Sequence, residues 1–115
     1  MTRKRSVTCE AWDVVTVPLP FTDRATQKRR PALILSRRSF NRHGHSLMAM
    51  ITSSRPSWPG DSPLSQLASC GLSTPCIVRL KLFTLDNRLI VKRIGRLSDQ
   101  DKNRVTAALQ AILPS

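Results

Sequence analysis

Hydrophobic residues in this chain gather in short runs that polar stretches separate. Residues 11–18 are rich in β-branched side chains, residues 32–35 are uniformly apolar, and residues 47–52 form another short apolar run. Runs of this length predict strands, and the uninterrupted one predicts a strand that is buried on both faces. The polar and basic stretches over residues 19–29 and 37–46 predict loops between these strands.

The middle of the chain is irregular and is followed by two further predicted strands. Residues 53–63 contain three prolines and a glycine, which excludes a regular element, and residues 64–70 predict a short helix that ends at Gly71. Residues 77–82 alternate between apolar and charged side chains, as a half-buried strand does. Residues 89–94 then predict a returning strand.

The last segment carries the clearest local signal. Ser98 precedes Asp99 and Asp101, an arrangement that caps the first turn of a helix and places acids where the helix dipole favours them. Apolar residues then recur at helical spacing up to Ile112, and Pro114 ends the segment. The whole pattern predicts a mainly β fold with one C-terminal helix, most simply a small twisted barrel of about five short antiparallel strands.

Length and composition restrict the class of protein. The chain has 115 residues, enough for one domain, and 40% of them are hydrophobic, too many for a disordered basic chain. We expect residues 1–10 to form a loose, flexible basic tail and residues 11–113 to form the single domain. No run approaches the ~20 apolar residues of a membrane span, and no signal-peptide pattern follows the basic start. The three cysteines are odd in number and far apart, which favours reduced thiols in the cytoplasm.

The charge balance predicts an anionic partner. The 19 Lys and Arg residues exceed the 7 Asp and Glu residues, so the net charge is +12. A field of this strength is typical of proteins that bind a polyanion, although an acidic protein partner or a purely solubilising surface also fits it. Aromatic residues make up only 4% of the chain, too few for many base-stacking platforms, so phosphate contacts would carry much of any RNA binding.

Simple strand pairing brings a cation and hydroxyl groups together. The connection between the two apolar runs is short, so the strands are expected to pair antiparallel. If Ser36 faces Leu47, then Arg30 faces Ser53, next to Thr52. Facing Cβ atoms lie about 5 Å apart, so a guanidinium and hydroxyl donors would converge at one end of the sheet.

Several segments, in order along the chain, resemble the MazF/PemK family of toxin–antitoxin ribonucleases. The resemblance is carried by residues 13–23, 28–36 and 51–53, and by Pro59-Gly60-Asp61, Gly71-Leu72, Val78-Arg79-Leu80, Thr84-Leu85-Asp86 and residues 94–98. It covers about residues 11–112, which makes it far more specific than a single motif.

This resemblance implies a small SH3-like β-barrel with a C-terminal helix, acting as a homodimer. It implies a metal-independent endoribonuclease without a cofactor that cuts single-stranded RNA at short sequences. A cognate antitoxin with an acidic or disordered tail is its implied protein partner, and no membrane is involved. The family's catalytic Arg and Thr fall on Arg30 and Thr52, and an Arg of the PemK branch falls on Arg79.

RNA cleavage of this kind needs few protein groups. The 2′-oxygen attacks the adjacent phosphorus, and the enzyme stabilises the extra negative charge that develops. Arg30 would bind the nonbridging oxygens and the Thr52 hydroxyl would add a hydrogen bond, whereas an arginine is a poor general base. The candidate RNA-binding residues are Lys28, Arg29, Ser53 and Arg79, and more distant phosphate contacts are Arg37, Arg38 and Arg55.

The sequence carries only weak signals for other kinds of active site. His43 and His45 are the only histidines, the residue type that titrates near neutrality, but the intervening Gly44 indicates a solvated turn. Cys70, Cys76 and a histidine lack the close spacing of a metal site. Two rival functions remain open: a non-enzymatic gyrase poison resembling the CcdB toxins, which share this barrel, and a basic barrel that binds RNA without cutting it.

The sequence departs from the family pattern at three places. Residues 24–27 contain no glycine, although glycines usually precede the basic cluster. Lys81 replaces the acid that often follows two residues after the strand arginine, so that acid is not available for proton transfer. Trp12 stands where glycine is usual.

Overall fold

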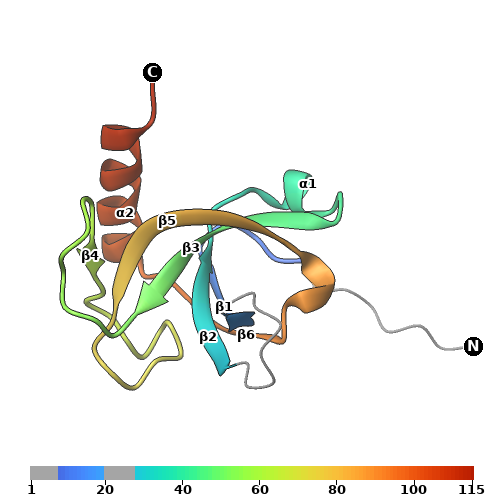
Figure 1. Cartoon of the computed structure of the whole chain (residues 1–115), viewed down its shortest axis with the longest axis horizontal. Helices are drawn as coiled ribbons and strands as arrows, with labels where there is room; N and C mark the ends of the chain where they lie inside the picture. Colours follow the sequence, from blue (N-terminus) through green and yellow to red (C-terminus); the bar gives the residue numbers. More distant parts are fainter. Residues whose placement is uncertain (1–7, 20–27) are drawn as a thin grey trace, which may run out of the picture.

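Among the described residues, 8–19 and 28–115, six strands form one curled antiparallel sheet in the computed structural model, with a C-terminal helix beside it (Figure 1). The elements are β1 (Asp13–Leu19), β2 (Lys28–Ile34), α1 (Arg38–Asn41), β3 (His45–Thr52), β4 (Ser62–Pro63), β5 (Ile77–Asp86), the 3₁₀ helix η1 (Asn87–Leu89), β6 (Lys92–Arg96) and α2 (Asp99–Ile112). The strand order is β4-β5-β3-β2-β1-β6. The predicted mainly β fold with a C-terminal helix is confirmed, with the sheet curled into a half-barrel.

The central hairpin of β2 and β3 is confirmed, but its predicted register is wrong by one residue. Ala32 faces Met50, so Leu35 rather than Ser36 lies opposite Leu47. The reason is local, because the Leu35 N–H donates to the Leu47 carbonyl at 2.8 Å while the Leu47 N–H donates to the Ser36 hydroxyl at 2.9 Å. The side chain of Ser36 therefore continues the pairing after its backbone has left the strand.

The connection between these strands holds a short helix, α1, where a loop was predicted. Asn41 at its end is fully buried, and its side-chain amide donates to the Cys9 carbonyl at 2.8 Å. The Asn87 amide in turn donates to the Asn41 carbonyl at 2.6 Å, and Ser46 donates to Asn87 at 2.7 Å. These bonds satisfy buried polar groups and join α1 to η1.

The predicted tail is too long at its C-terminal end. Cys9 is only 1% exposed and packs with core residues, so the folded part begins before residue 11. Residues 1–7 lie outside the described residues, as do residues 20–27, which hold most of the predicted loop over residues 19–29. Lys28 and Arg29, the last residues of that loop, belong to β2 because they pair with the end of β1.

The short helix predicted for residues 64–70 is absent, and isolated turns replace it. The buried Asp101 carboxylate of α2 accepts hydrogen bonds from the N–H groups of Ser65 and Gln66, at 3.0 and 3.1 Å. Burial alone would raise the pKa of Asp101, but these hydrogen bonds and that of the Ser65 hydroxyl lower it overall. The segment is therefore held by a carboxylate far away in sequence rather than by helical bonds.

The last two predicted elements have different outcomes. The strand expected over residues 89–94 does not return beside β5, because η1 redirects the chain and β6 pairs with β1 instead. The helix prediction is confirmed: α2 begins after Ser98, whose hydroxyl accepts the Asp101 N–H at 3.2 Å. None of the helices in the described part of the chain is long and apolar enough to cross a membrane.

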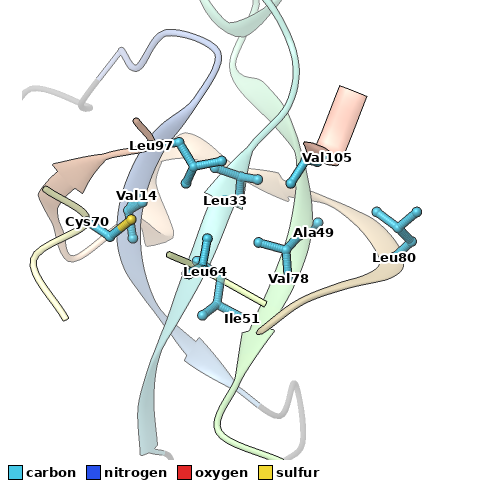
Figure 2. Close-up of a cluster of buried hydrophobic side chains, with 10 residues drawn as sticks. All are labelled: Val14, Leu33, Ala49, Ile51, Leu64, Cys70, Val78, Leu80, Leu97 and Val105. Carbon is cyan, nitrogen blue, oxygen red and sulfur yellow. The ribbon is translucent and has the colours of Figure 1, made fainter. Parts of the chain in front are cut away.

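Each face of the sheet carries its own hydrophobic cluster, because successive strand residues point to opposite sides. In β2, Leu33 belongs to one cluster, whereas Ala32 and Ile34 belong to the other, so the prediction of burial on both faces is confirmed. Figure 2 shows the first cluster, in which Val105 of α2 packs over the sheet. Its members are Val14, Leu33, Ala49, Ile51, Leu64, Cys70, Val78, Leu80, Leu97 and Val105.

Two glycines let the turn after residue 68 pack directly against β6. A Cβ on Gly95 would lie 2.3 Å from the carbonyl carbon of Cys70, and one on Gly71 would lie 2.0 Å from the carbonyl oxygen of Ile94. The Arg96 N–H donates to the Ser69 carbonyl at 2.8 Å across this contact. The outer edge of β6 is thus covered by the chain itself, which protects it from pairing with other strands.

The variant Gly95→Ala tests this contact. We expect a loss of about 3 kcal/mol in the free energy of unfolding, because the added methyl group meets backbone atoms that have no rotamer to change. The matched control is Gly44→Ala, where φ is +117° and no atom lies within 4 Å of the added Cβ, so only backbone strain of about 1 kcal/mol is expected. Urea unfolding of both variants makes the comparison, and equal losses would contradict the close contact.

Candidate functional site

Arg30 and Thr52 lie on one face of the sheet at one end of the β2–β3 hairpin. Arg30 is exposed near the start of β2, and Thr52 is the half-buried last residue of β3. The paired part of the β2–β3 hairpin ends at Ala32 and Met50, and Arg30 and Thr52 each lie two residues beyond that last pair. Because side chains alternate along a strand, Arg30 lies on the face of Ala32 and Thr52 on the face of Met50, which is the same face of the sheet.

Arg79 of β5 joins this face through an irregular pairing. Ala49 faces Leu82, whereas the next residue, Met50, faces Arg79, so β5 contains two extra residues at this point. Because an insertion of two residues preserves the alternation of side chains, Arg79 stays on the same face as Met50. Thr52 faces Ile77, so Arg79 is its diagonal neighbour, with Cβ atoms about 7–8 Å apart.

The Arg79 guanidinium is fixed by a carboxylate from the segment between β3 and β4. Its Nη2 lies 2.9 Å from Asp61 Oδ2 and its Nε lies 3.2 Å from Asp61 Oδ1, a two-point contact. Nη2 also donates to the Arg55 carbonyl at 3.2 Å and to the Ser57 hydroxyl at 3.3 Å. Within residues 8–19 and 28–115 its Nη1 group has no hydrogen-bond partner, and the side chain as a whole is 13% exposed.

Asp61 organises the segment that carries it. The same carboxylate accepts the backbone N–H groups of Ser57 and Trp58, each at 2.9 Å, which closes a tight turn over residues 57–61. The hydrogen bond from Arg79, with the two backbone N–H groups, lowers the pKa of Asp61 to about 2 although burial opposes this. Asp61 is therefore ionised at neutral pH and acts as a structural anion rather than as a proton donor.

The hydroxyl of Thr52 faces the turn that follows its strand. Its Oγ1 accepts the Ser54 N–H at 3.2 Å and donates to the Ser54 hydroxyl at 3.1 Å, a turn typical of Thr and Ser. The guanidinium of Arg30 makes no hydrogen bond or ion pair with the part of the chain that the structure describes. The two side chains predicted to carry the chemistry thus lie on one face at one end of the hairpin, and the Arg30 cation is open to an anionic ligand.

The other predicted RNA-binding residues divide between the two faces. Lys28 lies two residues before Arg30 and therefore shares its face, whereas Arg29 points to the opposite face. Ser53 is exposed directly after β3, and Arg55 is exposed next to the Arg79 contact. The more distant Arg37 and Arg38 flank the start of α1, and Arg38 lies 3.9 Å from Glu10.

The rival chemical groups do not join this site. His45 begins β3 and Thr52 ends it, so about 20 Å of strand separates them, and His43 lies in the turn before β3. No group of three His, Cys, Asp or Glu residues among those described is placed to hold a metal ion. Cys70 is buried in the first core cluster, where burial raises the pKa of its thiol.

Two of the three family departures now have a structural context. Lys81 lies two residues after Arg79 on the same face, and its Nζ sits 4.5 Å from the centre of the Trp58 ring. Trp12 has a left-handed backbone with φ of 77°, the conformation that favours the usual glycine. Its N–H donates to the Ile34 carbonyl at 2.7 Å and its carbonyl accepts from Leu97 at 3.0 Å, so pairing holds the strained backbone. Residues 24–27 lie outside the described residues.

Sequence reasoning missed two residues of this region, Asp61 and Trp58. Asp61 appeared only within a family segment, and the turn that it closes depends on contact with β5. Trp58 carried no periodic signal, yet the residue is 43% exposed beside the cationic face. A tryptophan between prolines in a polar segment was the available signal, because a core residue is not expected there.

The fold and this face define the class: a small basic half-barrel that presents arginines and a threonine at one end of its sheet. The chain belongs to the family of PemK-like, MazF-like toxins of type II toxin–antitoxin systems, whose family model matches residues 10–113. The predicted membership is therefore confirmed. A search of curated proteins found no significant match.

Solved structures of similar fold carry names that agree with this family. An endoribonuclease in complex with its cognate antitoxin from a mycobacterial species matches with a TM-score of 0.73 at 20% identity, covering 93% of this chain and 98% of that one. MazE–MazF of Deinococcus radiodurans matches with a TM-score of 0.73 at 22% identity, covering 92% and 96%. The Mycobacterium tuberculosis toxin MazF-mt6 matches with a TM-score of 0.70 at 24% identity, covering 86% and 93%.

The variant Asp61→Asn tests the carboxylate at the centre of the 57–61 turn. We expect the free energy of unfolding at neutral pH to fall by roughly 1 to 2 kcal/mol, because charged hydrogen bonds to Arg79 and to two backbone N–H groups are weakened. The pKa of Asp61 is about 2 in the folded state, below the ordinary 3.8, so its contribution is complete above about pH 4 and is lost as the pH falls towards 2.

Urea unfolding of wild type and variant between pH 2 and pH 7 measures this contribution. The difference between the two proteins should shrink as the pH falls from 4 towards 2. Glu10→Gln is the matched control, since Glu10 is exposed and 3.9 Å from its partner, and it should change stability by less than about 0.5 kcal/mol. A constant difference for Asp61→Asn over the whole range would show that its charge does not matter.

Proposed function

We propose that this protein is a metal-independent endoribonuclease that cuts single-stranded RNA at short sequences. The observation that supports it most directly is the common face of Arg30, Thr52 and Arg79 in a chain of the MazF-like toxin family. These residues combine charge-assisted donors, which bind a phosphodiester, with a hydroxyl group at one end of the sheet. The net charge of +12 supplies the long-range attraction for RNA.

In the proposed reaction the RNA supplies its own nucleophile. The 2′-oxygen forms a bond to the adjacent phosphorus and the bond to the 5′-oxygen breaks, which leaves a 2′,3′-cyclic phosphate and a 5′-hydroxyl. The 2′-hydroxyl loses its proton and the leaving oxygen gains one. Arg30 stabilises the negative charge on the nonbridging oxygens as it builds up, and the Thr52 hydroxyl donates a further hydrogen bond. Arg79 contacts a neighbouring phosphate of the RNA through its Nη1 group.

The protein partners in this proposal are a second copy of the chain and an antitoxin. A homodimer would double the basic surface along which RNA lies. An antitoxin with an acidic tail would compete with RNA for the same cations, and salt would weaken both contacts. Two of the structural neighbours are complexes of a toxin with its antitoxin, which supports this choice of partner.

The variant Arg30→Ala should lose RNA cleavage. We expect the cleavage rate to fall about 100-fold to 1,000-fold, because a donor aimed at the developing charge is removed. The assay incubates purified protein with a long single-stranded RNA in EDTA and maps the new ends and their terminal phosphates. Arg42→Ala is the matched control: this arginine is exposed at the end of α1, near the start of β3 rather than its end, and its loss should leave the rate unchanged.

Three outcomes would contradict the proposal in different ways. Intact RNA together with inhibition of gyrase would favour the CcdB-like poison. Salt-sensitive binding of RNA without new ends would favour a barrel that binds but does not cut. Cleavage that stops in EDTA and returns with a divalent cation would contradict the metal-independent mechanism.

The variant Thr52→Val isolates the contribution of one hydroxyl. Valine keeps the shape and the preference for a strand but loses the two hydrogen bonds with Ser54, so we expect a loss of about 1 kcal/mol in the free energy of unfolding and a fall of about tenfold in kcat with little change in KM. Single-turnover cleavage of a short RNA that contains one mapped site gives both values. Ser54→Ala is the control, because it removes a partner of Thr52 without removing the hydroxyl that is proposed to act. An unchanged kcat in Thr52→Val would exclude this residue from the chemistry.

A further inference from the structure

Trp58 is an exposed aromatic ring with a fixed position. Its side chain is 43% exposed, and it belongs to neither of the two core clusters. Its backbone N–H is bonded to the Asp61 carboxylate at 2.9 Å, and the ammonium group of Lys81 lies 4.5 Å from the centre of the ring. The backbone of Trp58 is thus fixed by Asp61, and its exposed ring is oriented by the cation–π contact with Lys81 rather than by burial.

The carboxylate that fixes Trp58 also fixes Arg79. Asp61 bonds to both residues at once, so the ring is tied to the face that carries Arg79 and, diagonally, Thr52. The segment that carries Trp58 begins directly after Thr52. An exposed ring is therefore positioned next to the proposed cleavage site by the same ion pair that orients one of its arginines.

The surroundings of the ring match one kind of ligand. Lys81 beside the ring and the Nη1 group of Arg79 offer positive charge to a phosphodiester, while the ring offers a flat apolar surface. A nucleotide of single-stranded nucleic acid presents both features together, a base with two π-faces and an anionic link. An aliphatic protein surface would use the ring but leave these cations unpaired.

We infer that Trp58 is a stacking residue for a nucleobase of the RNA substrate, held in place by Asp61 and Lys81, and that it contributes affinity for the strand. This inference rests on the proposed function. It gives Lys81, which replaces the acid usual in the family, a role in orienting the ring and in contacting phosphate. Stacking accepts every base to some degree, so Trp58 strengthens binding and leaves the hydrogen-bonded readout to other groups.

The sequence has two tryptophans, so the experiment uses the full chain with Trp12→Phe, in which Trp58 is the one tryptophan left. The probe is a single-stranded oligonucleotide that carries the mapped cleavage site with 2′-O-methyl groups, so that no attacking hydroxyl is present. We expect saturable quenching of the Trp58 fluorescence. In cleavage assays, Trp58→Leu should raise KM roughly tenfold with kcat within about twofold, and Trp58→Phe should recover most of the affinity.

The control variant is Phe40→Leu, which changes an aromatic ring of similar exposure, 49%, on α1. It should leave both constants unchanged. Unaltered fluorescence at saturating probe, or an unchanged KM in Trp58→Leu, would overturn the inference while cleavage by the wild type upholds the proposed function. A joint loss of kcat and thermal stability in Trp58→Leu, with no recovery in Trp58→Phe, would show a structural role instead. Failure of the wild type to cut RNA would remove the proposed function and this inference together.

Discussion

The alternation of side chains across β2, β3 and β5 is the constraint on which the candidate site depends. A single inserted residue in β5 would have turned Arg79 to the opposite face, where the first core cluster lies. The bulge instead inserts two residues, Leu80 and Lys81, so the parity of the strand is unchanged. Arg79 therefore remains on the face of Arg30 and Thr52, and β5 still buries apolar residues on its other side. The extra twist of such a bulge also suits a sheet that curls (Figure 1).

The site depends next on Asp61, because this anion holds the cations of the basic face in place. Arg79 and Lys81 are two positive groups on one strand that repel each other, and contacts with Asp61 and Trp58 offset this repulsion. The carboxylate fixes the first directly and the second through the ring of Trp58. The ion pair neutralises part of the positive charge of Arg79, whereas the guanidinium of Arg30 makes no ion pair with the described residues. Arg79 is therefore held in a fixed orientation by its ion pair, and Arg30 exerts the stronger attraction on phosphate.

The sequence was sufficient wherever neighbouring residues determine the structure. Ser98 and the acids after it defined the start of α2, and the apolar runs defined the central hairpin, because both signals are local. The register failed by one residue because the side chain of Ser36 bonds to the opposite strand, which no alternation pattern reveals. The helix predicted for residues 64–70 failed because Asp101, 36 residues from Ser65, binds its N–H groups. Arg30 and Thr52 came from the family pattern, whereas Asp61 acquires its role only from Arg79, 18 residues away.

The distribution of titratable groups limits the chemistry of this end of the sheet. Histidine is the residue type best suited to proton transfer near neutrality, but His43 and His45 lie at the opposite end of β3. Asp61 is ionised, since its pKa is about 2, and its lone pairs are occupied by Arg79 and two backbone N–H groups. Neither type of group is therefore placed to exchange a proton with RNA. Under the proposed function, the rate would depend on electrostatic stabilisation by Arg30 and on the geometry of the RNA strand. A stacking ring would add affinity for the RNA strand in this case, because it contacts a base without touching the reacting atoms.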